Sequence, residues 1–206
     1  MDKIKVMRKT TESEMTVILD FSPIKPDYAE KIKTPLSFLN HMIEHIVWRS
    51  GVNIALDCKL SHFALTHVIC EDLGIALGKA VGEYIKRVDG AYGFGDAIGI
   101  IDEAKAECAI SFESRAYIDF DTHGIDIPAS VEGMYSEDLV TFLEGIAQGA
   151  MCTLHIDLLK GVNGHHIWEA IFRSVGSALN RAVYVSPDRC GKTSGVAGRI
   201  DWSIER

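Results

Sequence analysis

Two stretches of the chain read as copies of each other, "HVICEDLGIALG" at residues 67–78 and "HHIWEAIFRSVG" at residues 165–176. An offset of 98 residues aligns the opening histidine, a glutamate four residues later and the glycine that ends each stretch. At the second position the copies differ, because Val68 stands where the other copy has His166. A shared histidine and glutamate at one spacing, at the start of two predicted helices, indicates an internal duplication.

The pattern around these stretches predicts an α+β fold. Alternating apolar residues indicate strands, and apolar residues three and four apart indicate helices. We expect a duplicated unit, with two sheets each packed with a pair of helices, in a single domain made of two repeats of about 8–96 and 97–196. The predicted strands are 4–10, 14–21, 52–60, 104–112, 115–121 and 153–159, and the predicted helices are 36–51, 67–88, 136–151 and 165–185.

Three local signals refine these elements. Gly51 is expected to end the first helix. Ser136 is expected as the N-cap of the third helix, with acidic residues following in its first turn. The glycines Gly93 and Gly95 in "GAYGFGD" are expected to form a turn.

Composition limits the class of protein. With 206 residues, 47% of them hydrophobic, the chain can bury a core, and its net charge of −8 argues against nucleic acid or an anionic membrane as the main partner. The five cysteines form no C-x-x-C pair, which indicates a reducing compartment. With no apolar segment at the N-terminus and no run long enough to span a membrane, we expect a cytoplasmic enzyme with a small-molecule substrate.

The paired histidines and glutamates predict metal sites. Residues four apart share a helix face, so His67 with Glu71, and His165 with Glu169, each offer two ligands to one cation. His166 projects about 100° away from its neighbour and so would serve a different ion. The sequence therefore predicts two metals between the repeats, and imidazole with carboxylate suits Mn, Fe or Zn.

Other motifs have simpler interpretations. His45, His62 and His123 are expected to cap helices or bind backbone carbonyls. "HMIEH" at 41–45 matches a zinc-peptidase pattern, but five residues often match by chance. "GKT" at 191–193 resembles the end of a phosphate-binding loop, yet Ser186 stands where that pattern needs glycine.

Several motifs together resemble one family, the imidazoleglycerol-phosphate dehydratases. They are "RKTTESEMTV", "FLNHM", "HVICEDLGIALG", "DEAKAECAISFESRAY" and "TLHIDLLKGVNGHHIWEAIF", in order from about Arg8 to about Val196. The resemblance implies a hydro-lyase of histidine biosynthesis with a duplicated α+β fold. It also implies a large homo-oligomer, typically a 24-mer, with two manganese ions per active site at subunit interfaces.

The resemblance also implies the metal ligands. The first manganese would be held by His41, His165 and Glu169, and its fourth position falls on Val68, which cannot ligate. The second would be held by a complete set, His67, Glu71, His155 and His166. We therefore expect one tight manganese, with the other weakened or absent, and expect Val68→His to restore it.

The implied substrate pocket departs from the family in three places. Arg49 replaces a histidine, Gly93 replaces a phosphate-binding arginine, and Ser194 replaces a lysine, with Lys192 displaced by two residues. Two lost phosphate contacts would weaken phosphate binding by roughly 10²–10⁴-fold unless Arg49 and Lys192 compensate. The implied substrate-binding residues are Glu12, Arg49, Arg115, Lys192 and Ser194, and the implied catalytic residues are Glu12, Glu71 and Glu169.

Three functions stay open from the sequence. The chain is a working dehydratase with a remodelled pocket, a diverged member with one strong metal and a different ligand, or a non-catalytic assembly. Retention of Glu12, Arg115 and seven of eight metal ligands favours an enzyme. The resemblance implies that the metals act as Lewis acids on the imidazole-containing substrate while Glu12 transfers a proton.

Overall fold

The computed structural model describes residues 3–198, 200 and 203–205, and within them the chain forms two units with the same topology. The first unit has strands β1 (Lys3–Lys9), β2 (Ser13–Asp20), β3 (Ile32–Lys33) and β4 (Asn53–Leu60), with helices η1 (Tyr28–Lys31), α1 (Ser37–Ser50) and α2 (Thr66–Arg87). The second has β5 (Phe94–Ile101), β6 (Ala104–Ser111), β7 (Tyr117–Asp121), β8 (Ser130–Val131), β9 (Met134–Tyr135), α3 (Ser136–Ala150), β10 (Thr153–Lys160), α4 (Gly164–Val183) and η2 (Pro187–Arg189).

The two four-stranded sheets have corresponding strand orders. They run β1-β2-β4-β3 and β5-β6-β10-β7, and in each the first three strands are antiparallel while the last pairs in parallel. The helices α2 and α4 begin at Thr66 and Gly164, which are 98 residues apart, as the offset of the two motifs predicts. The predicted duplicated α+β fold is therefore confirmed.

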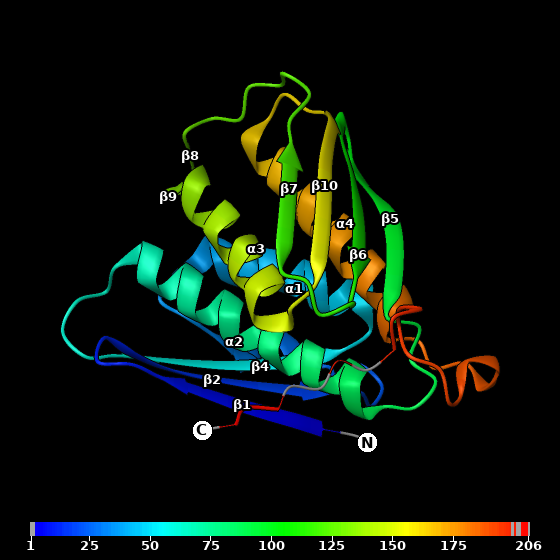
Figure 1. The fold of residues 1–206 in the computed structure, drawn as a ribbon. Helices are drawn as coiled ribbons and strands as arrows, with labels where there is room; N and C mark the ends of the chain where they lie inside the picture. The colour runs from blue at the N-terminus through cyan, green and yellow to red at the C-terminus, as the bar shows by residue number, and fades with distance from the viewer. Residues whose placement is uncertain (1–2, 199, 201–202, 206) are drawn as a thin grey trace.

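The helices α1, α2, α3 and α4 lie between the two sheets (Figure 1). Contacts run across the middle of the molecule, with α2 on α3 and α1 on α4, so each helix pair joins the two units. The core between them includes Phe142, Trp168 and Phe172, all fully buried. This cross-packing brings residues of α1 beside residues of α4, more than a hundred positions later in the chain.

The turn expected at Gly93 and Gly95 is wrong for Gly95, which lies inside strand β5, whereas Gly93 precedes the strand with a φ of +65°. In "FGDAIGII" the apolar alternation is inverted: Gly95 and Gly99 face the core, while Ile98 and Ile100 are exposed. A Cβ at Gly95 would lie 2.0 Å from the carbonyl oxygen of Ala178, so glycine is what lets the backbone of α4 approach this strand.

The expected cap at Ser136 is also wrong by one residue. Tyr135 is the N-cap of α3 and makes no side-chain cap hydrogen bond. The Ser136 hydroxyl instead donates to the Pro128 carbonyl at 2.5 Å and accepts from the Trp168 indole at 3.1 Å. Gly51 does end α1 in the left-handed conformation, as expected. Within the described residues, no helix is both long and apolar enough to cross a membrane.

Candidate metal centre

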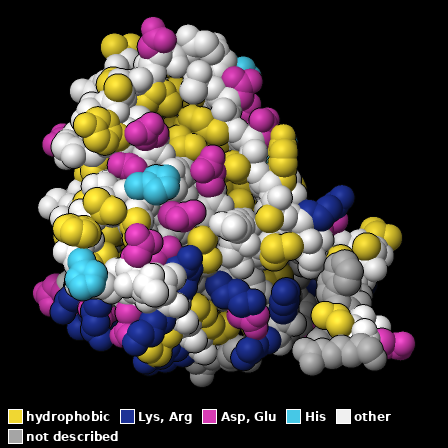
Figure 2. Space-filling model, turned by 60° about the vertical axis from the view of Figure 1, so that its left-hand side comes forward, with side chains coloured by type: hydrophobic (Ala, Val, Ile, Leu, Met, Phe, Trp, Pro, Cys, Tyr) yellow, Lys and Arg dark blue, Asp and Glu magenta, His cyan; other side chains and the backbone are white. Residues whose placement is uncertain are grey.

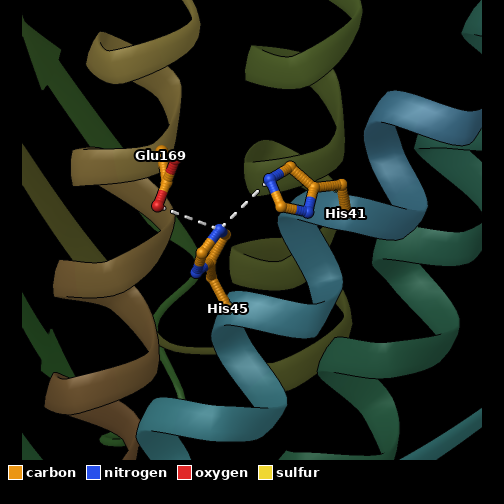
Figure 3. A group of neighbouring side chains, drawn as sticks. All are labelled: His41, His45 and Glu169. Atoms are coloured by element: carbon orange, nitrogen blue, oxygen red, sulfur yellow. Dashed lines mark hydrogen bonds and ion pairs between the residues drawn. The ribbon is translucent and has the colours of Figure 1, made fainter. Parts of the chain in front are cut away.

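Facing surfaces of α1 and α4 bring three imidazoles and a carboxylate together. His41 and His45 lie one turn apart on α1, and His165 and Glu169 lie one turn apart on α4. The Nε2 atom of His45 is 3.2 Å from Glu169 Oε1 and 3.4 Å from His41 Nε2 (Figure 3). His165 Nε2 lies 3.6 Å from Glu169 Oε2. Three of these four residues are the predicted first-metal ligands, and the fourth is His45.

His45 is expected from the sequence to have only a structural role, and the structure instead places it at the centre of this group. The sequence does hold a signal, because His45 is four residues after His41 and so shares its helix face. Because the same two histidines belong to the zinc-peptidase pattern, which often matches by chance, their spacing alone does not predict a ligand pair. The glutamate of that pattern, Glu44, contacts His41 from the outside of the group.

Burial controls the charges in this group. The side chain of Glu169 is 7% exposed and forms an ion pair with Arg173 one turn along α4. Burial lowers the pKa of His45 to about 4, although the neighbouring Glu169 carboxylate acts in the opposite direction. His45 is therefore neutral at pH 7 and has a free lone pair, which is the form that binds metals.

Outer carboxylates orient two of the imidazoles. Glu44 Oε2 lies 3.4 Å from His41 Nδ1, and Glu132 Oε1 lies 3.2 Å from His165 Nδ1. A carboxylate on Nδ1 keeps the proton there and leaves Nε2 as the ligand atom, which is the usual arrangement around metal-binding histidines. Both Nε2 atoms then point toward the group.

The N-cap of α4 holds the backbone of both His165 and His166, while their side chains point in different directions. The Asn163 side chain accepts hydrogen bonds from the backbone N–H groups of both histidines, at 2.8 and 3.3 Å. Their rings are nearly perpendicular, at 87°. His166 Nδ1 turns away to Glu103 at 2.8 Å, and that hydrogen bond raises the pKa of His166.

The second predicted ligand set is dispersed within one chain. His67 lies 3.6 Å from Asp138, and His155 on β10 lies 3.5 Å from Asp119 on β7. The helix α2, which carries His67 and Glu71, begins at the left of Figure 1, whereas α4, which carries His166, begins at the top. Across the part of the chain that the structure describes, these four residues do not form a group of converging ligand atoms.

A separate group lies on the exposed side of the second sheet. His123, also expected to have a structural role, has its Nε2 2.8 Å from Asp157 and its Nδ1 3.5 Å from Asp121. The three side chains are close enough to share an ion. They are also largely exposed, and such groups often pair without metal.

Glu12 is tied to the start of α2 through its neighbours. It lies in the turn between β1 and β2. The buried carboxylate of Asp72 forms an ion pair with Arg8 at 2.5 Å and accepts a hydrogen bond from the Ser13 hydroxyl, and these two residues flank that turn. Asp72 follows Glu71 directly. The exposed Glu12 therefore lies at the end of the molecule that also carries the first turn of α2.

Two departures from the family pattern contact each other. Gly93 has a left-handed φ of +65°, and a Cβ placed there would lie 1.9 Å from Ser194 Oγ. The Ser194 side chain therefore occupies the space where a side chain at position 93 would begin. An arginine at 93 and the present path of residues 193–195 are mutually exclusive.

Among the other predicted pocket residues, Arg49 lies one turn beyond His45 on α1, at the edge of the metal group. Arg49 lines a hollow of about 410 Å³ with Asn180 and Arg181. Lys192 donates to the backbone carbonyl of Asp188 at 2.9 Å, and the exposed Arg115 pairs with Glu113 at 2.8 Å.

Surface charge is unevenly distributed. On the face drawn in Figure 2, histidine side chains lie among acidic ones, and lysines and arginines gather toward the lower part of the view. A mixed histidine and carboxylate surface is chemically suited to divalent cations.

Comparison with known proteins gives one consistent family. Residues 34–179 match the family model described as imidazoleglycerol-phosphate dehydratase. Proteins of that name from Nitrosomonas eutropha and Chlorobium phaeobacteroides are 32% and 30% identical, over 92% and 93% of this chain and 94% of each relative. A crystal structure of the Pyrococcus furiosus protein, in complex with a small molecule, has a TM-score of 0.78 and 29% identity, covering 94% of this chain and 99% of that one.

Proposed function

Because this chain belongs to the imidazoleglycerol-phosphate dehydratase family, we propose that it removes water from imidazoleglycerol phosphate to give imidazoleacetol phosphate, a carbon–oxygen lyase step of histidine biosynthesis. One observation supports this most strongly. His41, His165 and Glu169, which the family pattern places on one metal, come together between α1 and α4 although they are far apart in the sequence.

The residues present fit a manganese ion. Imidazole nitrogens and a carboxylate oxygen form a donor set that divalent first-row transition metals accept, and outer carboxylates orient two of the imidazoles. A bound manganese would act as a Lewis acid and as a template for the substrate's imidazole ring. Glu12 would then hold or transfer the proton that leaves carbon, since it lies exposed at the surface of the β1–β2 turn.

The dispersed second set supports an assembly proposal. We infer that His67, Glu71, His155 and His166 complete a second manganese site only when chains associate, in a homo-oligomer of up to 24 copies. His67, His155 and His166 are each available at the surface of one chain, and each already has a carboxylate beside it, Asp138, Asp119 and Glu103 respectively.

The remodelled contact between Gly93 and Ser194 favours a second candidate. A family member whose pocket does not hold phosphate in the usual way would act on a related, non-phosphorylated imidazole compound. In that case Arg115 of the "ESRAY" motif, which is exposed and pairs with Glu113, remains as a cationic group for binding the substrate.

The deciding experiment is an assay on the purified oligomer with manganese. Formation of imidazoleacetol phosphate is expected, and Glu12→Gln should reduce kcat by roughly 10²-fold or more if it transfers the proton. Lys79→Gln, on the exposed side of α2, serves as the control. No turnover by the manganese-loaded oligomer would rule out the dehydratase proposal, and turnover of only the non-phosphorylated analogue would favour the second candidate.

A further inference from the structure

We propose that His45 is a metal ligand and takes the position that Val68 leaves open in the first metal site. The inference rests on the proposed function, because it concerns the metal centre that the dehydratase would use. It means that His41, His45, His165 and Glu169 form a complete three-histidine, one-carboxylate set within a single chain.

The distances between donor atoms match those around one ion. Ligand atoms about 2.1 Å from a tetrahedral or octahedral metal lie about 3.0–3.4 Å from one another. The observed separations are 3.2 Å between His45 and Glu169, 3.4 Å between His45 and His41, and 3.6 Å between His165 and Glu169. His41, His45 and Glu169 already have ligand atoms within 4.8 Å of one another, and His165 would join them by a turn of its side chain, since its ring lies 5.5 Å from that of His41.

The helix arrangement explains why position 45 can replace position 68. His41 and His45 form a pair four residues apart on α1, and they face the matching pair His165 and Glu169 on α4. Val68 lies on a different helix, α2, which packs on α3. A histidine added to a helix that already lines the site reaches the ion without any change in the assembly.

A purely structural role explains the geometry less well. Glu169 already has a cationic partner in Arg173, so its buried charge does not require His45. The Nε2 atoms of His41 and His45 also face each other at 3.4 Å. Two imidazole nitrogens in this arrangement share either a proton or a cation, and a cation binds both nitrogens and the Glu169 carboxylate at once, whereas one proton bridges two of these three groups.

The test is a titration of the metal-free oligomer with Mn(II), followed by electron paramagnetic resonance. Wild type, His45→Gln, His41→Gln and His62→Gln are compared. His62 is an exposed histidine of the loop after β4 and serves as the matched control. We expect His45→Gln and His41→Gln each to weaken one class of Mn(II) site by about 10–100-fold, and His62→Gln to bind as wild type does. Electron spin-echo modulation should lose one coordinated imidazole nitrogen in His45→Gln.

Two results would overturn the proposal. One is a His45→Gln oligomer with wild-type affinity and nitrogen count. The other is a crystal structure of the Mn(II)-loaded wild type in which His45 Nε2 is beyond bonding distance of the ion, and this measurement decides the matter even if the variant fails to assemble. Activity is read separately. Wild type that binds Mn(II) through His45 but does not dehydrate the substrate refutes the proposed function and leaves this inference intact.

Discussion

A double-mutant cycle at Gly93 and Ser194 tests whether two departures from the family pattern form one structural unit. Gly93→Ala places a Cβ where the backbone has a φ of +65° and Ser194 Oγ would be 1.9 Å away. The left-handed backbone costs about 1–2 kcal/mol for a residue with a Cβ. The overlap with Ser194 adds about 1–3 kcal/mol, so the free energy of unfolding should fall by about 2–5 kcal/mol.

Removing the serine side chain separates these two contributions. In a Ser194→Gly background the overlap disappears, and Gly93→Ala should cost only the backbone part, about 1–2 kcal/mol. The coupling energy of the cycle is then about 1–3 kcal/mol. Gly124→Ala is the matched control, because Gly124 has a φ of +76° and a Cβ added there would meet nothing within 4 Å.

The assay is urea unfolding at one fixed protein concentration, followed by tryptophan fluorescence, to which the buried Trp168 contributes. If Gly93→Ala is no more destabilising than Gly124→Ala, or if the coupling is below about 0.5 kcal/mol, Ser194 does not occupy this space. A measured coupling would also explain why restoring an arginine at 93 alone should fail to restore phosphate binding.

Three further outcomes are expected. Gly99→Ala should lower the free energy of unfolding by about 1–3 kcal/mol, because its Cβ would lie 2.1 Å from a carbonyl of α4, and a variant as stable as wild type in urea would contradict that packing. The Lys25 ammonium holds the pKa of Asp20 well below its usual value, so this carboxylate stabilises the fold above about pH 4 and loses that effect as the pH falls. Asp20→Asn should therefore be less stable than wild type at pH 7, with the difference shrinking below pH 4 in a pH series of melting temperatures. Val68→His should restore Mn(II) affinity to the His45→Gln oligomer but change wild type little, and a titration without rescue would show that position 68 does not reach the first site.

The sequence predicted the duplicated α+β fold because local patterns carry it. Helix starts, the alternation of most strands and the offset of 98 residues between the motifs depend on residues close in the chain, and α2 and α4 do begin 98 residues apart. The strand β5 was not predicted because its core-facing positions are glycines. Glycine is needed at these positions because the backbone of α4 approaches the strand closely. When packing against a distant helix requires glycine at the core-facing positions of a strand, the sequence of that strand lacks the apolar alternation that would predict it.

The candidate metal site likewise has residues that the sequence predicted and one that only the structure brought in. Spacing in the sequence predicted His165 and Glu169 as a ligand pair, and the family resemblance added His41. Only the packing of α1 on α4 placed His45 among them, because that contact joins residues more than a hundred positions apart. Residue type and spacing determine which side chains can bind a metal, whereas the helix crossing decides which of them meet.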